Sequence, residues 1–458
     1  MRRLTLALAL ASSLALGSWS APYALSADGA TPRSASGRGT NILVVGIDSR
    51  TGLSAAEKRR LNVGGKGCDC TDVMMLVHLS ADLRRASVVS IPRDSYVAYA
   101  VETQPAPKGK INGAYALGRG PLTVATVEKV TGLRVDHYLE TGFTGFEQAV
   151  NGLGGAVVCT DKALKDENSG LDLAAGRHHV DGRGALRYVR ARHVERPGDL
   201  GRVRRQQRAV SDLLTRLRSD RVLTDPISTY DAARTLLKSV RTDARTSVWD
   251  LVRLGTALGR LSPSRTEFVT VPISEFDRRV PGVGSTLIWH DERARALWTA
   301  LAEDRPVKGD TLVQPRPANL VPNNPASVKV RVDAARVAEA LRAAGFAASD
   351  ESAAAPAIRR PGPPVIRHAP GQEDDASTLA TALPGALREA VPGHGAALDV
   401  LVGTDPVTVR PVTYDRNIVD GAAVTGDSLG CLGADRVGVD RAGAYRAGAD
   451  RAGDAGVG

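Results

Sequence analysis

Residues 41–50 read Asn-Ile-Leu-Val-Val-Gly-Ile-Asp-Ser-Arg, a nearly continuous apolar run that ends in a carboxylate and an arginine. An apolar run without polar alternation is typical of a strand that is buried on both faces of a sheet. Two more such runs follow at 73–79 and 86–91, joined by a short turn. Strand-like and helix-like segments then alternate, so we predict an α/β fold over 40–310, layered α-β-α around a central mixed sheet.

The other segments of this domain are expected from spacing and from residues that favour helix ends. Pro121 stands at a first helical position, and Asp199 can cap a helix N-terminus. Helices are therefore expected over 122–130, 143–150 and 200–217. Strands are expected over 137–140, 156–160 and 267–272, and the polar, glycine-rich stretch 53–70 is expected to be a long loop.

A second, smaller unit follows a proline-rich linker at 311–325. Its pattern is β-α-β-α-β, with strands expected over 328–332, 365–368 and 398–401 and helices over 334–344 and 376–391. This order predicts a small C-terminal α/β domain over 326–412. The tail 413–458 repeats Asp-Arg steps with little apolar surface, so we expect it to be disordered.

The first 27 residues resemble an export signal. A short basic start is followed by an uncharged stretch over 4–23, rich in Leu and Ala. The segment 1–27 is either a cleaved signal peptide or a retained signal anchor, and 28–39 is a linker. The rest of the chain is then expected at the extracytoplasmic face of the cell membrane, or secreted if the signal is cleaved.

The charge balance narrows the choice of ligand. The net charge is +10 with a pI near 9.6, which is compatible with nucleic acid, an anionic membrane or an anionic substrate. Aromatic residues are only 4% of the chain, whereas nucleic-acid surfaces interleave basic and aromatic side chains. Because the arginines recur at turns and strand ends, the sequence favours an anionic substrate, and we expect no nucleic acid.

The chain has four cysteines, at 68, 70, 159 and 431. An exported protein can form disulfides. A Cys68–Cys70 bridge would be strained, so Cys159 is expected to pair with Cys68 or with Cys70. Cys-Asp-Cys could also belong to a zinc site, but no further ligands stand at suitable spacing.

Arginines and aspartates gather in separate blocks that follow the apolar runs. Asp48 ends the first run and Asp72 enters the second, so the two carboxylates can share one hard cation. Arg50 and the pair Arg93-Asp94 stand at the same strand ends, and Lys110 follows farther on. Several guanidiniums beside carboxylates suit a diphosphate together with a divalent metal.

A third block extends over 188–206. Tyr188, Arg190 and Arg192 alternate, so an extended segment would project both arginines from one face. Arg202, Arg205 and Gln206 are spaced to share one face near the N-terminus of the next helix, a place that favours anions. Guanidiniums this close repel one another unless an anion lies between them.

These motifs resemble the LytR–CpsA–Psr family of cell-envelope proteins, over about 40–215. The match is carried by Gly-x-Asp-x-Arg at 46–50, Thr-Asp-Val-Met-Met at 71–75, Ser-Ile-Pro-Arg-Asp at 90–94 and Lys-Ile-Asn-Gly-Ala-Tyr at 110–115. It continues through Ala-Leu-Arg-Tyr-Val-Arg-Ala-Arg at 185–192 to Asp-Leu-Gly-Arg at 199–202. Residues 326–403 are similar to the LytR-type C-terminal domain.

The resemblance implies a membrane-anchored phosphotransferase of cell-wall assembly. Such an enzyme moves a glycopolymer from a polyprenyl pyrophosphate to a sugar hydroxyl of peptidoglycan, through a phosphodiester and with Mg²⁺, or alternatively Mn²⁺. Asp48 and Asp72 match the metal-side positions, and Asp48, Arg93 and Asp94 are the catalytic candidates. The pyrophosphate-side positions are Arg50, Arg93, Lys110, Arg190, Arg192, Arg202, Arg205 and Gln206. Many relatives have Arg and Thr where this chain has Cys70 and Val73.

Three other functions are compatible with the sequence. A polyprenyl pyrophosphate phosphatase would use water in place of the sugar hydroxyl. A non-catalytic envelope-binding scaffold would depend on the second domain, and a transcriptional attenuator is a name attached to some relatives. The sequence does not choose whether Asp48 or Asp94 accepts the proton of the attacking hydroxyl.

Overall fold

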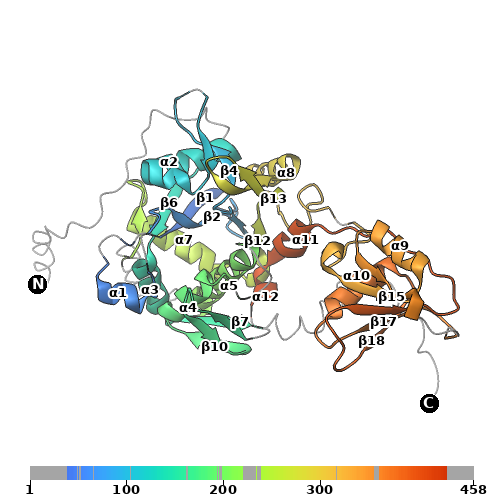
Figure 1. Cartoon of the computed structure of the whole chain (residues 1–458). Coiled ribbons are helices and arrows are strands. Elements are labelled where there is room, and N and C mark those ends of the chain that lie inside the picture. Colours follow the sequence, from blue (N-terminus) through green and yellow to red (C-terminus); the bar gives the residue numbers. More distant parts are fainter. Residues whose placement is uncertain are drawn as a thin grey trace, which may run out of the picture.

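A computed structural model describes residues 39–430, apart from 49, 51–52, 65–66, 104, 161–162, 193, 195–198, 220–233, 235–238, 316 and 355–359. A mixed sheet of seven strands lies at its centre, in the order β11-β6-β1-β2-β3-β12-β20 (Figure 1). The strands are β1 Thr40–Ile47, β2 Thr71–Leu79, β3 Ala86–Ser90, β6 His137–Thr141, β11 Arg241–Thr242, β12 Thr266–Thr270 and β20 Val424–Thr425. The pairs β1–β6 and β3–β12 are parallel and the others antiparallel, so the predicted mixed sheet is confirmed.

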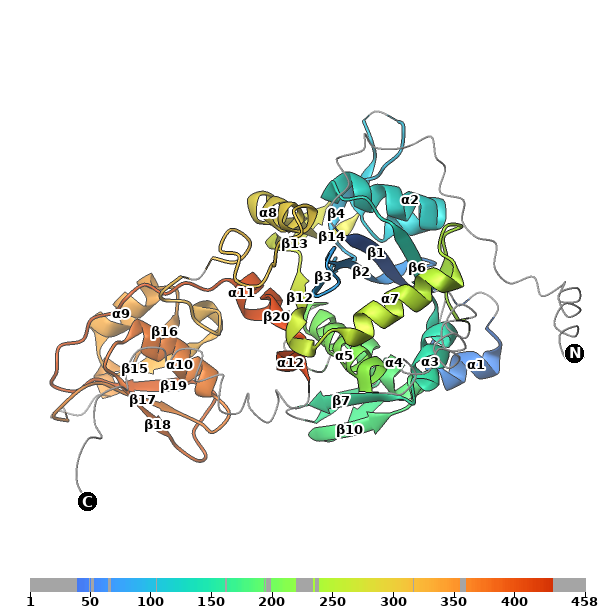
Figure 2. The same ribbon diagram turned by 180° about the vertical axis from the view of Figure 1, so that it is seen from behind.

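Alternate residues of the strands point to opposite faces of the sheet and form two cores, one on each face. Leu43 and Val45 pack with α2 Gly113–Thr131 and α8 Asp291–Ala302. Ile42 and Phe268 pack on the opposite face, against α5 Asp199–Ser219 and α7 Val248–Arg260. Figure 2 shows these helix layers from behind. The α-β-α layering follows from strands that are apolar on both faces.

Helix α4 Gly182–Arg190 packs against both α3 Phe143–Gly152 and α5. Four two-stranded sheets flank this frame in the described part of the chain: β4 Tyr96–Ala98 with β5 Lys108–Lys110, β7 Ala156–Thr160 with β10 Gly176–Val180, β8 Leu164–Asp166 with β9 Leu171–Leu173, and β13 Ile273–Val280 with β14 Gly284–Trp289. The strand expected at 156–160 therefore forms, but outside the central sheet.

Two segments of the first domain differ from the sequence-based expectation. The stretch 53–70 contains helix α1 Ala55–Arg60, which begins with a capping box between Ser54 and Glu57. That box is a recognisable start signal within an otherwise polar segment. Residues 188–190 belong to α4 rather than to a strand, because Asp181 caps the helix and Ala185, Leu186 and Val189 form its buried face.

The second domain contains a five-stranded sheet in the order β16-β15-β19-β17-β18. Its strands are β15 Lys329–Val332, β16 Ala347–Asp350, β17 Val365–His368, β18 Leu387–Ala390 and β19 Leu398–Leu401, with α9 Ala335–Ala343 and α10 Glu373–Ala382. The helix expected over 376–391 is too long, since Pro384-Gly385 ends it and 387–390 become β18. The fold is otherwise the small α/β domain that the pattern predicts.

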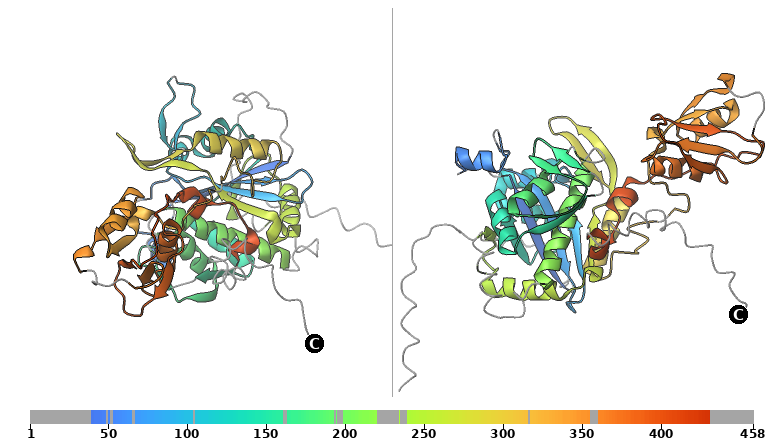
Figure 3. Two further views of the ribbon diagram at one scale, coloured as in Figure 1. Left: turned by 90° about the vertical axis from the view of Figure 1, so that its right-hand side faces the viewer. Right: turned by 90° about the horizontal axis from the view of Figure 1, so that it is seen from below.

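The chain after the second domain is ordered as far as residue 430, so the expectation of disorder from 413 is wrong for this stretch. Helix α11 Arg416–Gly421, strand β20 and helix α12 Gly426–Leu429 lie against the first domain (Figure 3). Residues 431–458 lie outside the described residues, as does the segment 1–27. In the part of the chain that the structure describes, none of the helices combines the length and apolar character needed to cross a membrane.

Candidate active site

A cavity of about 740 Å³ lies between the sheet and helices α3, α4 and α5. One part of its wall is apolar, lined by Val44, Val73, Met75, Phe143, Phe146, Leu186, Val189, Ala209, Val210 and Leu213. The other part carries charged and amide side chains from strand ends and helix ends. The predicted site residues Asp48, Arg50, Asp72, Arg93, Arg190, Arg192, Arg202 and Gln206 all line it.

The pairing of β1 with β2 explains this division. Ile47 lies opposite Thr71, so Asp48 and Asp72 emerge at the same edge of the sheet. Val44 lies opposite Met75, farther along the same two strands. The backbone N–H of Asp48 donates to the carbonyl of Cys70 over 3.0 Å, which fixes the exit from β1. The cavity is therefore charged at the strand ends and apolar along the strands.

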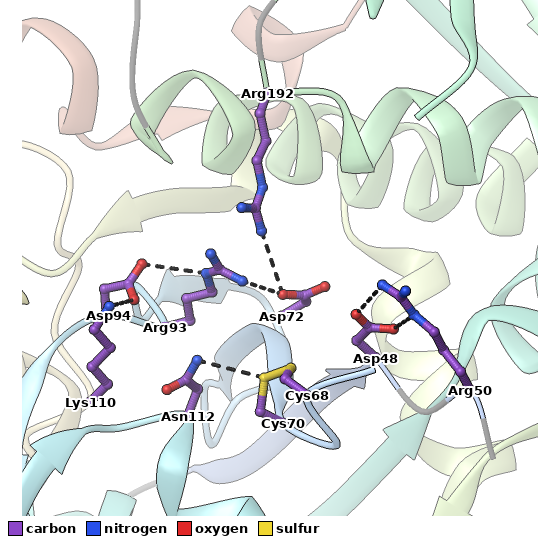
Figure 4. The surroundings of a disulfide bond; sticks show 10 residues. All are labelled: Asp48, Arg50, Cys68, Cys70, Asp72, Arg93, Asp94, Lys110, Asn112 and Arg192. Carbon is purple, nitrogen blue, oxygen red and sulfur yellow. Dashed lines mark hydrogen bonds and ion pairs between the residues drawn. A yellow bond between two sulfur atoms is a disulfide. The ribbon is translucent and has the colours of Figure 1, made fainter. Parts of the chain in front are cut away.

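Asp48 is held by Arg50 through two parallel hydrogen bonds (Figure 4). Nε and Nη2 of Arg50 donate to Oδ1 and Oδ2 of Asp48, both over 2.8 Å. This bidentate geometry is the strongest form of arginine–carboxylate pairing. It raises the pKa of Arg50 against the opposing effect of burial, and the charge of Asp72 adds to the rise.

Asp72 and Asp94 share Arg93 at the end of β3. Nη1 of Arg93 donates to Asp72 over 2.6 Å, and its Nε lies 3.4 Å from Asp94. Lys110 approaches Asp94 to 2.8 Å, and Arg192 lies 3.7 Å from Asp72. Asp94 and Lys110 are not among the residues that line the cavity. Asp94 instead holds Arg93 from the side away from Asp72, and Lys110 holds Asp94 (Figure 4).

Arg190 is the last residue of α4 and reaches the cavity from there. Its Nη1 donates to the carbonyl of Leu61 over 3.0 Å, and its guanidinium lies 4.8 Å from the ring centre of Phe143. Burial lowers the pKa of Arg190, although the nearby charges of Asp48 and Asp72 oppose that shift. The side chain is thus oriented by carbonyls and a ring, with no carboxylate partner among the described residues.

Helix α5 supplies Arg202 and Gln206 to the cavity, both less than 10% exposed. Arg205 is 1% exposed and turns away from the cavity, because its Nη2 donates to the carbonyl of Ala191. It therefore fixes the chain between Arg190 and Arg192. Gln207 is fully buried and donates to Ser90 over 3.1 Å. Its only sequence signal is its place in the family motif Arg205-Gln206-Gln207, which gave it no role in the site.

The predicted pairing of Cys159 is wrong. Cys68 and Cys70 form a disulfide with each other, and Cys159 is disulfide-bonded but to neither of them. Asp69 between them has a left-handed φ of 52°, which turns the chain so that both sulfurs lie on one side. An ion pair of 2.6 Å joins Asp69 to Arg119 of α2. Cys68 lines the cavity, so this short loop is part of its wall.

Several polar residues of the cavity wall lie in loops that no motif marked. Asn62, Asp166, Asn168 and Ser169 line it, with Asp166 at the end of β8 and the last two in the turn between β8 and β9. Asp166 accepts a hydrogen bond of 2.7 Å from the backbone N–H of Arg192. Their separation in sequence from the arginine blocks explains why sequence reasoning did not find them.

Within the described ranges, no group of three or more His, Cys, Asp or Glu side chains could hold a metal ion. Asp48 and Asp72 remain as two carboxylates at neighbouring strand ends. Magnesium in phosphate-handling sites is commonly held by one or two carboxylates together with substrate phosphates. The donor set therefore fits magnesium, which would share these carboxylates with Arg50 and Arg93.

The fold and the cavity define an α/β domain whose pocket joins a wall rich in arginine and aspartate to an apolar wall. Residues 23–303 match the LytR_cpsA_psr family, and residues 327–405 match the family described as LytR cell envelope-related transcriptional attenuator. The chain belongs to the LytR_cpsA_psr family, as its motifs predict.

Similar proteins have names that refer to the cell wall. The chain is 37% identical over 267 residues to the probable cell wall biosynthesis protein LcpB of Corynebacterium glutamicum, covering 57% of this chain and 61% of that protein. It is 28% identical over 258 residues to the polyisoprenyl-teichoic acid–peptidoglycan teichoic acid transferase TagU of Oceanobacillus iheyensis, covering 55% and 72%. The crystal structure of B. subtilis TagV aligns with a TM-score of 0.48 and 23% identity, over 59% of this chain and 99% of that one. The chain spans 61% of LcpB and 51% of the related LcpA.

Proposed function

We propose that this protein transfers a glycopolymer from a polyprenyl diphosphate carrier to a sugar hydroxyl of peptidoglycan. The observation that carries the proposal is one cavity with an apolar wall and a cationic wall. Five arginines line it against three aspartates, a formal surplus of two positive charges. This surplus matches the charge of a diphosphate diester. The names of TagU and its relatives support the same substrate class.

The apolar wall would take the start of the lipid. Each CH₂ group moved from water into such a wall contributes about 0.8 kcal/mol. Because the apolar residues lie farther along β1 and β2 than the carboxylates do, a lipid diphosphate could place its phosphates among the arginines and its tail against Val44 and Met75. The glycopolymer would then extend toward the polar loops that carry Asn62 and Asn168.

The arginines would bind the non-bridging phosphate oxygens by paired, charge-assisted hydrogen bonds. Arg190 is already oriented by the carbonyl of Leu61, and Arg93 by Asp72 and Asp94, so little side-chain entropy would be lost on binding. The acceptor hydroxyl oxygen attacks the phosphorus next to the glycopolymer. The bond from that phosphorus to the lipid phosphate breaks, the lipid phosphate leaves, and a phosphodiester remains.

The proton of the attacking hydroxyl passes to a carboxylate, and Asp48 is the better placed of the two candidates. It lines the cavity, whereas Asp94 does not. We propose that Asp48 and Asp72 also hold Mg²⁺ or Mn²⁺, which when bound would neutralise charge on the diphosphate. We further propose that the enzyme works at the extracytoplasmic face of the membrane, anchored by its N-terminal segment.

The test supplies purified protein with a polyprenyl diphosphate glycan and a peptidoglycan oligosaccharide. Mass spectrometry should detect a product that joins the two glycans through one phosphate, together with free polyprenyl phosphate. Release of polyprenyl phosphate without the joined product would favour the phosphatase. Failure to bind the lipid diphosphate at all would exclude both enzymes and leave the envelope-binding scaffold.

A further inference from the structure

The chain returns from the second domain to the first and completes its sheet. We call residues 413–430 the C-terminal strap. Strand β20 of this strap pairs antiparallel with β12 at the edge of the central sheet, with Val424 opposite Phe268. The family matches end at residues 303 and 405, so neither includes the strap.

The second domain begins and ends at one narrow neck. Leu320 and Thr413 form a β-bridge, and the N–H of Thr413 donates to the carbonyl of Asn319 over 3.0 Å. The side chain of Asn319 also donates to the carbonyl of Pro411 over 2.7 Å. The second domain is therefore inserted between two neighbouring points of the first domain, as Figure 3 shows.

Partly buried polar contacts hold the strap in place. Asp415 accepts a hydrogen bond of 2.6 Å from Arg293, whose side chain is 9% exposed. The side chain of Asn417 bonds both the N–H and the carbonyl of Ile273, each over 2.7 Å. The side chain of Gln314 accepts from the N–H of Ala423 over 2.9 Å. These contacts join the strap to the side chains of Arg293 and Gln314 and to the backbone of Ile273 in the first domain.

The strap also contacts helix α5, which carries Arg202 and Gln206. Nη2 of Arg204 donates to the carbonyl of Ala422 over 2.9 Å, and its Nη1 donates to Gln207 over 3.1 Å. Gln207 in turn bonds Ser90 of β3, three residues before Arg93. Farther along α5, Ser211 donates to the carbonyl of Gly426 over 3.1 Å. The strap thus touches the helix within two residues of the cavity wall.

We infer that the C-terminal strap is a positioning element of the active site, which seats α5 on the sheet so that Arg202 and Gln206 face the cavity. Arg204 acts through α5 and is itself a positioning residue. The ligand-binding part of this inference rests on the proposed function, and the folding part does not.

The first experiment compares two truncated chains, 1–430 and 1–412, which differ only in the strap. Geranylgeranyl diphosphate serves as the probe in calorimetry, and thermal unfolding is followed by circular dichroism. We expect 1–430 to bind like the full chain. We expect 1–412 to bind about tenfold more weakly or worse and to unfold at lower temperature, as loss of several partly buried hydrogen bonds and of strand β20 predicts. A synthetic peptide of residues 413–430 should restore both properties.

The second experiment uses the full chain and remains informative if 1–412 does not fold. Arg204→Met removes the hydrogen bond from Arg204 of α5 to Ala422 of the strap and leaves the bond from Ser211 to Gly426, and Arg204→Lys keeps one donor. Arg331→Met is the matched control, since Arg331 makes a bidentate pair with Asp399 in the second domain. We expect Arg204→Met to weaken probe binding about fivefold, Arg204→Lys to recover most of it, and Arg331→Met to change nothing.

Equal binding and equal unfolding temperature of 1–412 and 1–430 would overturn the inference, as would unchanged binding by Arg204→Met. If the unaltered protein fails to bind geranylgeranyl diphosphate, the proposed function fails. The unfolding temperatures of the two truncated chains, with and without the peptide, then still decide whether the strap completes the first domain.

Discussion

Replacing Arg190 by methionine separates ligand binding from stability more sharply than any other change in the cavity. Arg190 lines the cavity and is oriented by the carbonyls of Leu61 and Asn62, at 3.0 and 3.4 Å, and by the ring of Phe143. Burial opposes its charge, as its lowered pKa indicates, and the like charges of Arg50 and Arg192 add to that opposition. A methionine keeps most of the apolar contact with Phe143 and has no charge to desolvate.

The two effects have different magnitudes. Loss of the bonds to two carbonyls costs about 1–2 kcal/mol, and relief of the buried charge offsets part of it, so the free energy of unfolding should change by about 1 kcal/mol or less. Binding of a diphosphate loses a charge-assisted contact worth about 1.5–3 kcal/mol, or roughly 10–150-fold in dissociation constant.

Calorimetry with geranylgeranyl diphosphate and urea unfolding measure these two quantities. Arg187→Met is the matched control, because Arg187 lies on the same helix α4 one turn earlier and does not line the cavity. Its binding should stay within about twofold of the unaltered protein. Unchanged binding by Arg190→Met, in a variant that unfolds normally, would refute the assignment of this cavity to a diphosphate.

Three further changes test the surroundings of the cavity. Arg205→Met should lower the free energy of unfolding by about 1.5–3 kcal/mol in urea, because Arg205 is 1% exposed and its bond to Ala191 is charge-assisted. The double variant Cys68→Ser, Cys70→Ser should weaken diphosphate binding about threefold in calorimetry, since it loosens the loop whose carbonyl at Cys70 orients Asp48. His78, 2% exposed, has a pKa lowered from 6.5 chiefly by burial, with its bond to Asp304 opposing the shift. Folding therefore favours the neutral form of His78, and the stability of the protein should fall as the pH drops below about 6.5. The unfolding temperature, measured between pH 7 and 5, should fall less in His78→Gln than in the unaltered protein.

The sequence predicted the parts of the site that depend on strand ends. Asp48, Asp72 and Arg93 each follow or begin an apolar run, and strands in one sheet necessarily bring such ends together. The alternation of Arg190 and Arg192 suggested an extended segment, and this was wrong. The same stretch carries Ala185 and Val189 at helical spacing, and they form the buried face of α4. Burial of this apolar face favours the helical backbone, and the directions of the charged side chains result from the helix.

Two other errors came from contacts that local patterns do not encode. Cys68 and Cys70 pair because Asp69 adopts a left-handed conformation and is fixed by Arg119, a residue 50 positions away in sequence. The strap has too few apolar residues to fold alone, so composition predicted disorder. Its order depends on polar partners supplied by the first domain, among them Arg293 and the backbone of Ile273.

The distribution of charge explains why the cavity needs so much support from outside it. The arginines that line it repel one another, and the lining carboxylates balance only part of their charge. Residues that do not touch the cavity hold the arginines together: Asp94 holds Arg93, and Arg205 holds the chain between Arg190 and Arg192. Arg204 and Gln207 perform the same task for α5, since they connect it to the strap and to β3. A cavity prepared in this way binds an anion with little reorganisation, because the repulsion has already been overcome in the folding of the protein.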